Sequence, residues 1–360
     1  MTARRILLPF AALALVAAAF VLPFGSSSNS DADAVTAPAE PVTAFTVMDD
    51  GHGLCDLLAI DLASGVLTDL PAVPSEAACA WDLAVAADGT VYGIAGEQIG
   101  IGSVSPAVDS LGGAVLITFS ADGTPSGQTL TVGGSPISGG TFGGGIAVDA
   151  AGIVYVIAVN ETTCESQLIN LPPPLEVVSF APSDTYIFNC LFTVNLSSGE
   201  LTQVGDGFPP DTFVLGLTSC ASDMWTLMFE PDPFSGQQSP ASIGIPWVSI
   251  DATTAIATEA GITTQVLGFD CVATGNTVYA MSTGLGLTAN GIAPSEFVGA
   301  DLGTVDPTTG VFTETAAMTY PSNNNPNSSI SLLAFAVLPS PVEPAPEPGP
   351  AAPLVPIFTH

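Results

Sequence analysis

The feature that most constrains the fold of this chain is an internal repeat of short β-hairpins. One unit joins an apolar strand through a tight polar turn to a strand with an aromatic residue, at residues 83–92, 146–155, 215–225 and 267–279. A second unit, rich in Asp/Ser/Thr-Gly turns, alternates with it at residues 57–68, 115–123, 191–202, 248–254 and 305–313. Because glycine supplies the positive φ that such turns need, each unit predicts a hairpin.

Two successive hairpins supply strands A, B, C and D of one blade. This order occurs four times between about residues 82 and 315, which leaves a lone A strand at 330–337 and a B-C-D set that starts at 44–48. Pairing these two ends completes a fifth blade and removes exposed sheet edges. We therefore predict an all-β fold, a single propeller of five four-stranded blades over residues 42–339. A six- or seven-bladed ring and an immunoglobulin-like sandwich array are the alternatives.

The two ends of the chain differ from this repeat. Residues 1–34 read as a signal peptide and its exit, with Arg4 and Arg5 before an apolar run, and residues 35–41 form a short linker. An uncleaved membrane anchor is the alternative, because the run approaches the length of a spanning helix. Residues 340–360 are proline-rich and predict a disordered tail, with a semi-rigid polyproline II spacer as the alternative. We expect a secreted, extracellular or cell-surface protein, with the periplasm also possible.

Charge excludes several kinds of function. The formal net charge is −32, and Arg4 and Arg5 are the only basic side chains besides His52 and His360. Once the signal is removed, no Lys or Arg remains to hold a phosphate, a sialic acid or a nucleic acid. The negative electrostatic field of such a protein attracts cations, and Ca²⁺ in particular. A catalytic triad could use only the two histidines, and catalytic residues cannot be assigned from the sequence.

Six cysteines in an exported chain predict disulfides. Cys164 and Cys190 bracket the longest B–C insertion, Cys220 and Cys271 end neighbouring A strands, and Cys55 and Cys79 both approach the loop-rich face, so we predict the pairs Cys164–Cys190, Cys220–Cys271 and Cys55–Cys79. Trp81, Trp225 and Trp247 are expected to pack within or between blades rather than to stack on a sugar.

The long insertions all fall in B–C connections, which lie on one face of a propeller, and loops on a rigid scaffold commonly carry function. On this face, polar residues lie where B strands end or where A strands begin. We take them as candidate binding residues: Asp49, Asp50, Asp82, Glu97, Asn160, Glu161, Asp211 and Glu230. Asp82 and Asp211 enter A strands, which line the central channel, so these two are the candidate Ca²⁺ ligands. The alternative is that these carboxylates are simply solvated.

The segment Gly-Ile-Ala-Val-Asp-Ala-Ala-Gly-Ile-Val-Tyr-Val at 145–156 resembles the A–B hairpin of secreted bacterial propellers of the NHL, YVTN and gluconolactonase-like kind. The resemblance implies the fold and leaves the substrate open. Gluconolactonase-like propellers imply a hydrolysis that needs only carboxylates and Ca²⁺, but their metal ligands do not map residue by residue onto this chain.

Three functions remain compatible with these observations. The preferred one is a non-enzymatic binding or scaffold module, monomeric, which uses its loop-rich face to bind an extracellular protein, a glycan, a small molecule or Ca²⁺. The second is a Ca²⁺-dependent lactonase or esterase that uses carboxylates at the channel mouth. The third is a passive component of a surface coat. A membrane would be contacted only through an uncleaved signal segment.

Overall fold

The computed structural model describes residues 43–49, 54–73, 75, 78–95, 114–137, 144–158, 190–208, 213–220, 223–229, 245–263, 266–272, 275–283, 287–288, 291–292, 300–319 and 329–339. All of them belong to one compact unit, Ala39–His360. The predicted signal segment, linker and proline-rich tail lie outside these ranges. The described residues contain no candidate for a membrane-spanning helix.

The described residues form five four-stranded antiparallel sheets, each in A-B-C-D order, which confirms the five-bladed propeller. Blade 1 contains β4 (Asp82–Val85), β5 (Val91–Ala95), β6 (Val115–Phe119) and β7 (Pro125–Thr129). Blade 2 contains β10 (Gly145–Val148), β11 (Val154–Ala158), β12 (Cys190–Val194) and β13 (Leu201–Val204). Blade 3 contains β14 (Phe213–Cys220), β15 (Asp223–Phe229), β16 (Ile245–Ile250) and β17 (Ala257–Thr263).

The remaining two blades complete the ring. Blade 4 contains β18 (Val266–Cys271), β19 (Val278–Thr283), β22 (Ala300–Val305) and β23 (Phe312–Ala317). Blade 5 contains β24 (Ser329–Val337), β1 (Thr43–Asp49), β2 (Cys55–Asp61) and β3 (Leu67–Asp69). Two further hairpins are formed by β8 (Thr131–Val132) with β9 (Ser135–Pro136), and by β20 (Leu287–Thr288) with β21 (Gly291–Ile292).

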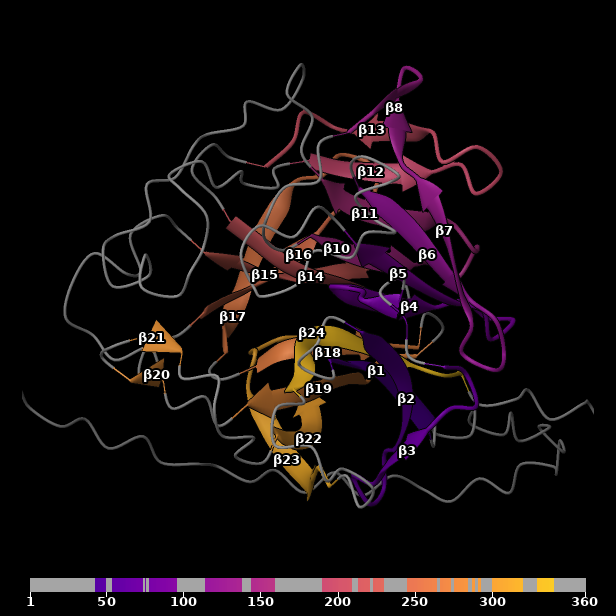
Figure 1. The fold of residues 1–360 in the computed structure, drawn as a ribbon. Coiled ribbons are helices and arrows are strands. Elements are labelled where there is room, and N and C mark those ends of the chain that lie inside the picture. Colours follow the sequence, from indigo (N-terminus) through magenta and orange to yellow (C-terminus); the bar gives the residue numbers. More distant parts are fainter. Residues whose placement is uncertain are drawn as a thin grey trace, which may run out of the picture. The chain divides into compact units, whose positions relative to one another are not determined.

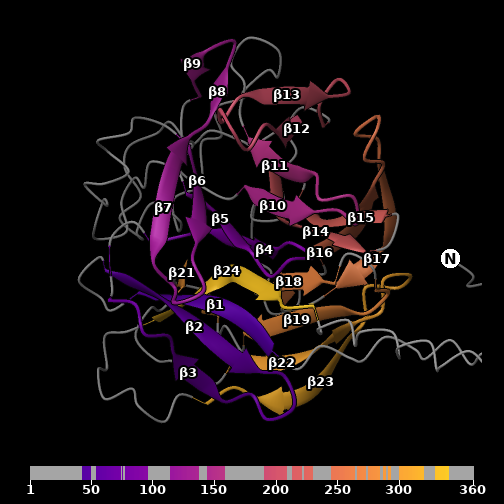
Figure 2. The same cartoon turned by 90° about the vertical axis from the view of Figure 1, so that its right-hand side faces the viewer.

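Blade 5 joins the two ends of the propeller, as the sequence predicts. Strand β1 pairs antiparallel with β24, with Ala44 opposite Val337 and Met48 opposite Ile330. Figures 1 and 2 show these two strands side by side, β1 in indigo and β24 in yellow. The pairing gives β1 a neighbouring strand on both sides, β24 and β2, and so completes the fifth blade of the ring.

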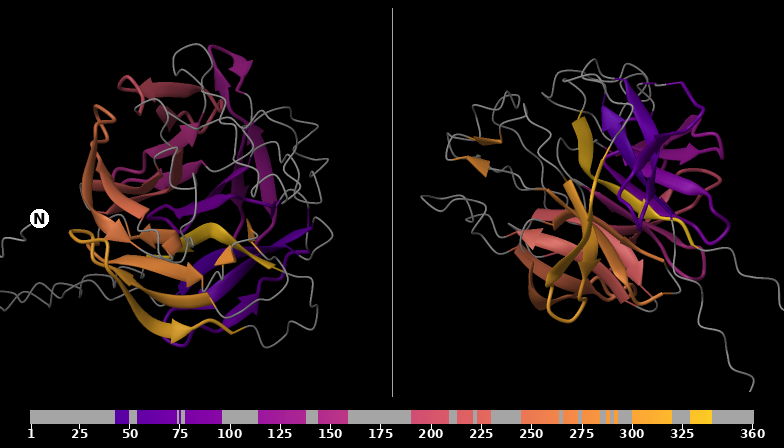
Figure 3. Two further views of the ribbon diagram at one scale, coloured as in Figure 1. Left: turned by 90° about the vertical axis from the view of Figure 1, so that its left-hand side faces the viewer. Right: turned by 90° about the horizontal axis from the view of Figure 1, so that it is seen from below.

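The A strands of the five blades form a closed innermost ring, in the order β24, β4, β10, β14, β18 and back to β24. Two further views of the same strands are given in Figure 3. Every residue of β4 and β10 is buried, whereas β7 and β23, the D strands of blades 1 and 4, are mostly half-buried or exposed. The sequence shows the same gradient, because the A strands are apolar and the D strands are rich in Thr, Ser and Glu.

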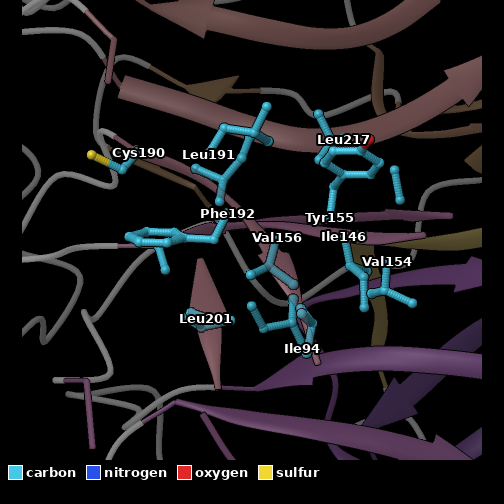
Figure 4. Close-up of a cluster of buried hydrophobic side chains, with 14 of the residues drawn as sticks. Ile94, Ile146, Val154, Tyr155, Val156, Cys190, Leu191, Phe192, Leu201 and Leu217 are labelled. Carbon is cyan, nitrogen blue, oxygen red and sulfur yellow. The ribbon is translucent and has the colours of Figure 1, made fainter. Parts of the chain in front are cut away.

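Apolar side chains fill the spaces between neighbouring blades. Figure 4 shows one such cluster, in which Ile94 of blade 1 and Leu217 of blade 3 lie on either side of blade 2 residues such as Ile146 and Val156. Between blades 3 and 4, Trp247 is fully buried, with Trp225 stacked on it and the Phe269 ring against its edge. Trp81 is half-buried and packs against the core cluster of blades 1 and 5. The expected packing role is therefore confirmed for all three tryptophans.

The C–D turns at residues 61–66, 120–124, 195–200, 251–256 and 306–311 make up what we call the outer rim. In four of them the first residue is an Asp or Asn that caps the turn, as at Asp61, whose Oδ1 accepts hydrogen bonds from the backbone N–H groups of Ala63 and Ser64. The residue four positions later has positive φ and is Gly65, Gly199 or Gly310 in three of these turns, but Ala255 in blade 3. These contacts explain the Asp/Ser/Thr-Gly signature of the repeat.

Each rim turn also touches a neighbouring blade. The N–H of Leu67 donates to Thr319 of blade 4, and the N–H of Thr319 donates to the carbonyl of Gly65. The hairpin β8–β9, which the sequence analysis did not anticipate, is held in a similar way. The carboxylate of Glu200 in blade 2 accepts hydrogen bonds from the Thr131 hydroxyl and from the N–H groups of Gly133 and Gly134.

Candidate functional site

Two carboxylates lie buried in the innermost ring. Asp82, the first residue of β4, is 1% exposed. Its Oδ1 accepts a hydrogen bond from the N–H of Leu83 at 2.9 Å. Its Oδ2 accepts from the N–H of Ile146 in β10 at 2.9 Å and of Leu217 in β14 at 3.1 Å. One side chain therefore joins the A strands of three consecutive blades.

Asp270, near the end of β18, is 4% exposed. Its Oδ1 accepts a hydrogen bond from the Thr218 hydroxyl of β14 at 2.6 Å, and its Oδ2 accepts from the N–H of Val337 in β24 at 2.8 Å. Asp270 thus connects the A strands of blades 3 and 5 to that of blade 4. Since Asp82 contacts Leu217 and Asp270 contacts Thr218, the two carboxylates bind consecutive residues of β14.

Burial dominates the electrostatics of both groups. It raises the pKa of Asp82 well above its usual value, against the lowering effect of three backbone hydrogen bonds, and the charge of Asp270 raises the Asp82 pKa further. Burial raises the pKa of Asp270 to about 7, although hydrogen bonds from Thr218, Val337 and Cys271 favour its charged form. These side chains therefore hold protons at pH values where exposed aspartates do not.

Of the predicted site residues, Asp82 is the one whose side chain the structure describes. The Asp82 side chain is buried in the innermost ring and is not solvated. Its carboxylate accepts hydrogen bonds from backbone N–H groups of two neighbouring A strands. With three hydrogen bonds on its two oxygens it is poorly disposed to bind Ca²⁺, and among the described residues no three Asp, Glu, His or Cys side chains cluster as metal ligands would. The role of Asp82 as a calcium ligand stays a prediction, which these contacts do not support.

The other predicted site residues cannot be placed in the same way. Asp49 is the last residue of β1, which puts it at the B–C end of blade 5. The remaining candidates lie outside the described residues: Asp50, Glu97, Asn160, Glu161, Asp211 and Glu230. Their roles stay predictions, including that of Asp211 as a calcium ligand.

The sequence analysis missed Asp270 as a site residue, although a signal was present. In the sheet register, Tyr92 lies opposite Ala84, Tyr155 opposite Ala147 and Tyr279 opposite Asp270. Asp270 therefore replaces an alanine found at the matching position in blades 1 and 2. A carboxylate at a position where other repeats have an alanine indicates a specific partner, because burying it otherwise is costly.

Two of the predicted disulfides are present, Cys55–Cys79 and Cys220–Cys271. The second joins the ends of β14 and β18, directly beside Asp270. Cys190 is also disulfide-bonded, but Cys164, its predicted partner, lies outside the described residues. Disulfides are typical of oxidising compartments outside the cytosol.

Comparisons with known proteins give only structural likenesses. No protein-family model matches this chain, and no curated protein matches it. Similar solved structures include TolB from Acinetobacter baumannii, with 9% identity, a TM-score of 0.40 and coverage of 78% of this chain and 54% of TolB. A putative TolB from Agrobacterium tumefaciens has 11% identity, a TM-score of 0.38 and coverage of 80% and 84%.

A gluconolactonase from Xanthomonas campestris has 11% identity, a TM-score of 0.35 and coverage of 77% of each chain. This chain spans about half the length of the Acinetobacter TolB chain. At these identities and TM-scores the functional names belong to those proteins alone. The five-bladed propeller of this chain is established by the pairing of its own strands.

Proposed function

We propose that this protein is an exported binding or scaffold module that contacts its partner through one face of the propeller. Because successive strands of a blade alternate in direction, the B–C and D–A connections share one face, which we call the insertion face. The A–B and C–D turns share the opposite face, which we call the turn face. The sheet order supports this division in all five blades.

The proposal rests on the lengths of the connections between strands. The described A–B links are short, for example from Val85 to Val91 and from Val148 to Val154. The long segments between B and C strands, at residues 96–114, 159–189, 230–244 and 284–299, all connect strand ends on the insertion face. A rigid ring with its variable segments on one face is the usual arrangement of a binding scaffold.

The ends of the propeller support the same assignment. Strand β1 begins, and β24 ends, where the other four blades have their A–B turn, and the N–H of Leu338 donates to the carbonyl of Thr43 at 2.9 Å. The chain therefore enters and leaves the propeller on the turn face.

The described carboxylates at the centre do not favour the hydrolase alternative. A nucleophile or general base must reach the substrate. Asp82 and Asp270 are instead buried, and their oxygens accept hydrogen bonds from strand residues. These two groups hold the ring together, so the chemistry of binding is expected in the insertion-face segments.

Shortening single insertion-face segments tests this proposal. Replacing residues 230–244 or 284–299 with a short Asn-Gly turn leaves all six cysteines in place. We expect at least one of these variants to lose binding on a glycan microarray, or the calcium-dependent shift in melting temperature, while it melts like the wild type without calcium. The matched control is a four-residue insertion in the turn-face loop at Gly152, where a Cβ would meet no atom within 4 Å.

Unchanged binding in both shortened variants would contradict the proposal, and so would loss of binding in the turn-face control. Turnover of a lactone or ester panel by the wild-type protein would instead favour the hydrolase. A wild-type protein that binds no glycan and shows no calcium shift would favour the passive coat component.

A further inference from the structure

The closure of the innermost ring depends on two buried acids. Asp82 connects β4 to β10 and β14, and Asp270 connects β18 to β14 and β24. Together the two side chains touch all five A strands. Strand β24 is the one that closes the propeller, and Asp270 binds its last residue, Val337.

The described residues contain no Lys, Arg or His that could balance these acids. Apart from Asp82 and Asp270, the only ionisable side chains on the five A strands are Cys220 and Cys271, which are joined in a disulfide. The ionisable residues of the neighbouring B strands are Asp49, Tyr92, Tyr155, Asp223 and Tyr279, and all are acids. Tyr279 is the one that lies opposite Asp270 in the sheet register. The sequence has no Lys or Arg beyond Arg5 that could approach from elsewhere.

We propose that the innermost ring is a proton-linked lock, in which Asp82 and Asp270 take up protons as the ring closes on β24 and release them when it loosens. Two buried negative charges that bind adjacent residues of β14 repel each other, and the described residues offer no Lys, Arg or His to neutralise either one. The ring is therefore held most tightly in mildly acidic solution. This inference does not depend on the proposed binding function, since its tests need no ligand.

The direction of the effect follows from the pKa values. Both acids have a folded-state pKa above the unfolded value near 3.8, and that of Asp270 is about 7. The resulting stability is fully present below pH 3.8 and is lost as the pH rises through about 7. For Asp270 alone, linkage predicts that the folding equilibrium constant falls about a hundredfold between pH 5 and pH 8.

The direct test is a carbon-13 NMR titration of the wild-type protein labelled at the aspartate side-chain carboxyl. We expect one resonance with an apparent pKa near 7 and a second that stays protonated above pH 5, whereas exposed aspartates titrate below pH 4. Assignment uses Asp270→Asn and Asp82→Asn. If no aspartate titrates above pH 5, the proposal is overturned, whether or not the variants fold.

The second test measures the melting temperature between pH 8 and pH 5. We expect it to rise as the pH falls in the wild type and to change less in Asp270→Asn. Asp306→Asn is the matched control, because Asp306 caps an exposed rim turn and bonds Thr308; its pH slope should equal that of the wild type.

His52 and His360 are the other side chains with ordinary pKa values in this window. A variant with both replaced by Gln should keep the rise in melting temperature. If the rise disappears in this variant and persists in Asp270→Asn, the histidines are the cause and the lock is refuted.

Discussion

The innermost ring and the outer rim both join neighbouring blades, and both use aspartates, but in opposite electrostatic settings. In the ring, burial raises the pKa of Asp82 and of Asp270. In the rim, hydrogen bonds from Ser64 lower the pKa of Asp61, and Thr308 lowers that of Asp306 in the same way. The lowered pKa therefore favours the charged form of the rim carboxylates, whereas the raised pKa favours the protonated form of the ring carboxylates.

This difference shows how one residue type serves two purposes within a single repeat. An exposed carboxylate at a turn keeps its hydration and gains two or three local donors, so its charge stabilises the turn only above its lowered pKa. A buried carboxylate loses hydration, so its donors must come from other strands. The rim is thus expected to weaken in strong acid, and the ring in neutral to alkaline solution.

The largest expected effect comes from the disulfide beside Asp270. Replacing Cys220 and Cys271 together with Ala opens a covalent tie between residues 51 apart and should destabilise the protein by about 4 kcal/mol. The Cys55–Cys79 bridge spans 24 residues, so its removal should cost about 0.7 kcal/mol less. Urea unfolding of the two double variants measures both values, and a larger loss for Cys55–Cys79 would show that ring closure is not the more sensitive region.

A comparable effect is expected at a rim glycine. Gly65 has φ +71°, and a Cβ there would overlap the carbonyl oxygen of Ala317 in blade 4. Gly65→Ala combines the left-handed backbone penalty with this overlap, which together should cost about 3 kcal/mol. Gly152→Ala is the control, with φ +81° and open space, and should cost about 1 kcal/mol. Equal denaturation midpoints for the two variants would show that the close approach of Gly65 to Ala317 does not contribute to stability.

A smaller effect should follow the loss of one donor in the ring. Thr218 is fully buried, and its hydroxyl donates to Asp270 at 2.6 Å. Thr218→Val keeps the shape and removes the bond, at a cost of about 2 kcal/mol at pH 8. Because that bond lowers the pKa of Asp270, the variant should show a higher Asp270 pKa and a smaller loss of stability at pH 5. A loss that is greater at pH 5 than at pH 8 would contradict this.

The smallest effect is expected at Ala255, which has φ +56° where three other rim turns have glycine. Ala255→Gly relieves about 1 kcal/mol of backbone strain but removes a buried methyl group of about 0.8 kcal/mol. The melting temperature should therefore stay within about 2 °C of the wild type. A large loss would mean that the Ala255 methyl, packed in the core cluster of blades 1 to 3, matters more than its area indicates.

Much of the fold could be predicted because each element carries a local signal. Turn glycines such as Gly65 and Gly310, capping residues such as Asp61, and alternating apolar strands mark the hairpins. The unpaired strands at the two ends then require blade 5 to be shared. The pairs Cys55–Cys79 and Cys220–Cys271 followed from the strand order, because that order brings the ends of strands together.

The candidate site was less predictable, since it depends on contacts between strands distant in the sequence. Asp82 was named as a candidate binding residue, but its burial between three strands was not foreseen, and Asp270 was not named at all. The hydrogen bond from Leu217 to Asp82 spans 135 positions, and no local pattern encodes it. The hairpin β8–β9 was missed for the same reason, because Glu200 in another blade holds it.

The sequence by itself determined the number of blades, the way the ring closes and the absence of Lys and Arg from the chain after Arg5, because these follow from repeat counting, turn chemistry and composition. Only the tertiary structure decided which acids are buried and which are solvated. Exposure of an aspartate depends on how closely neighbouring strands pack around it, and burial then outweighs the hydrogen bonds that favour its charge.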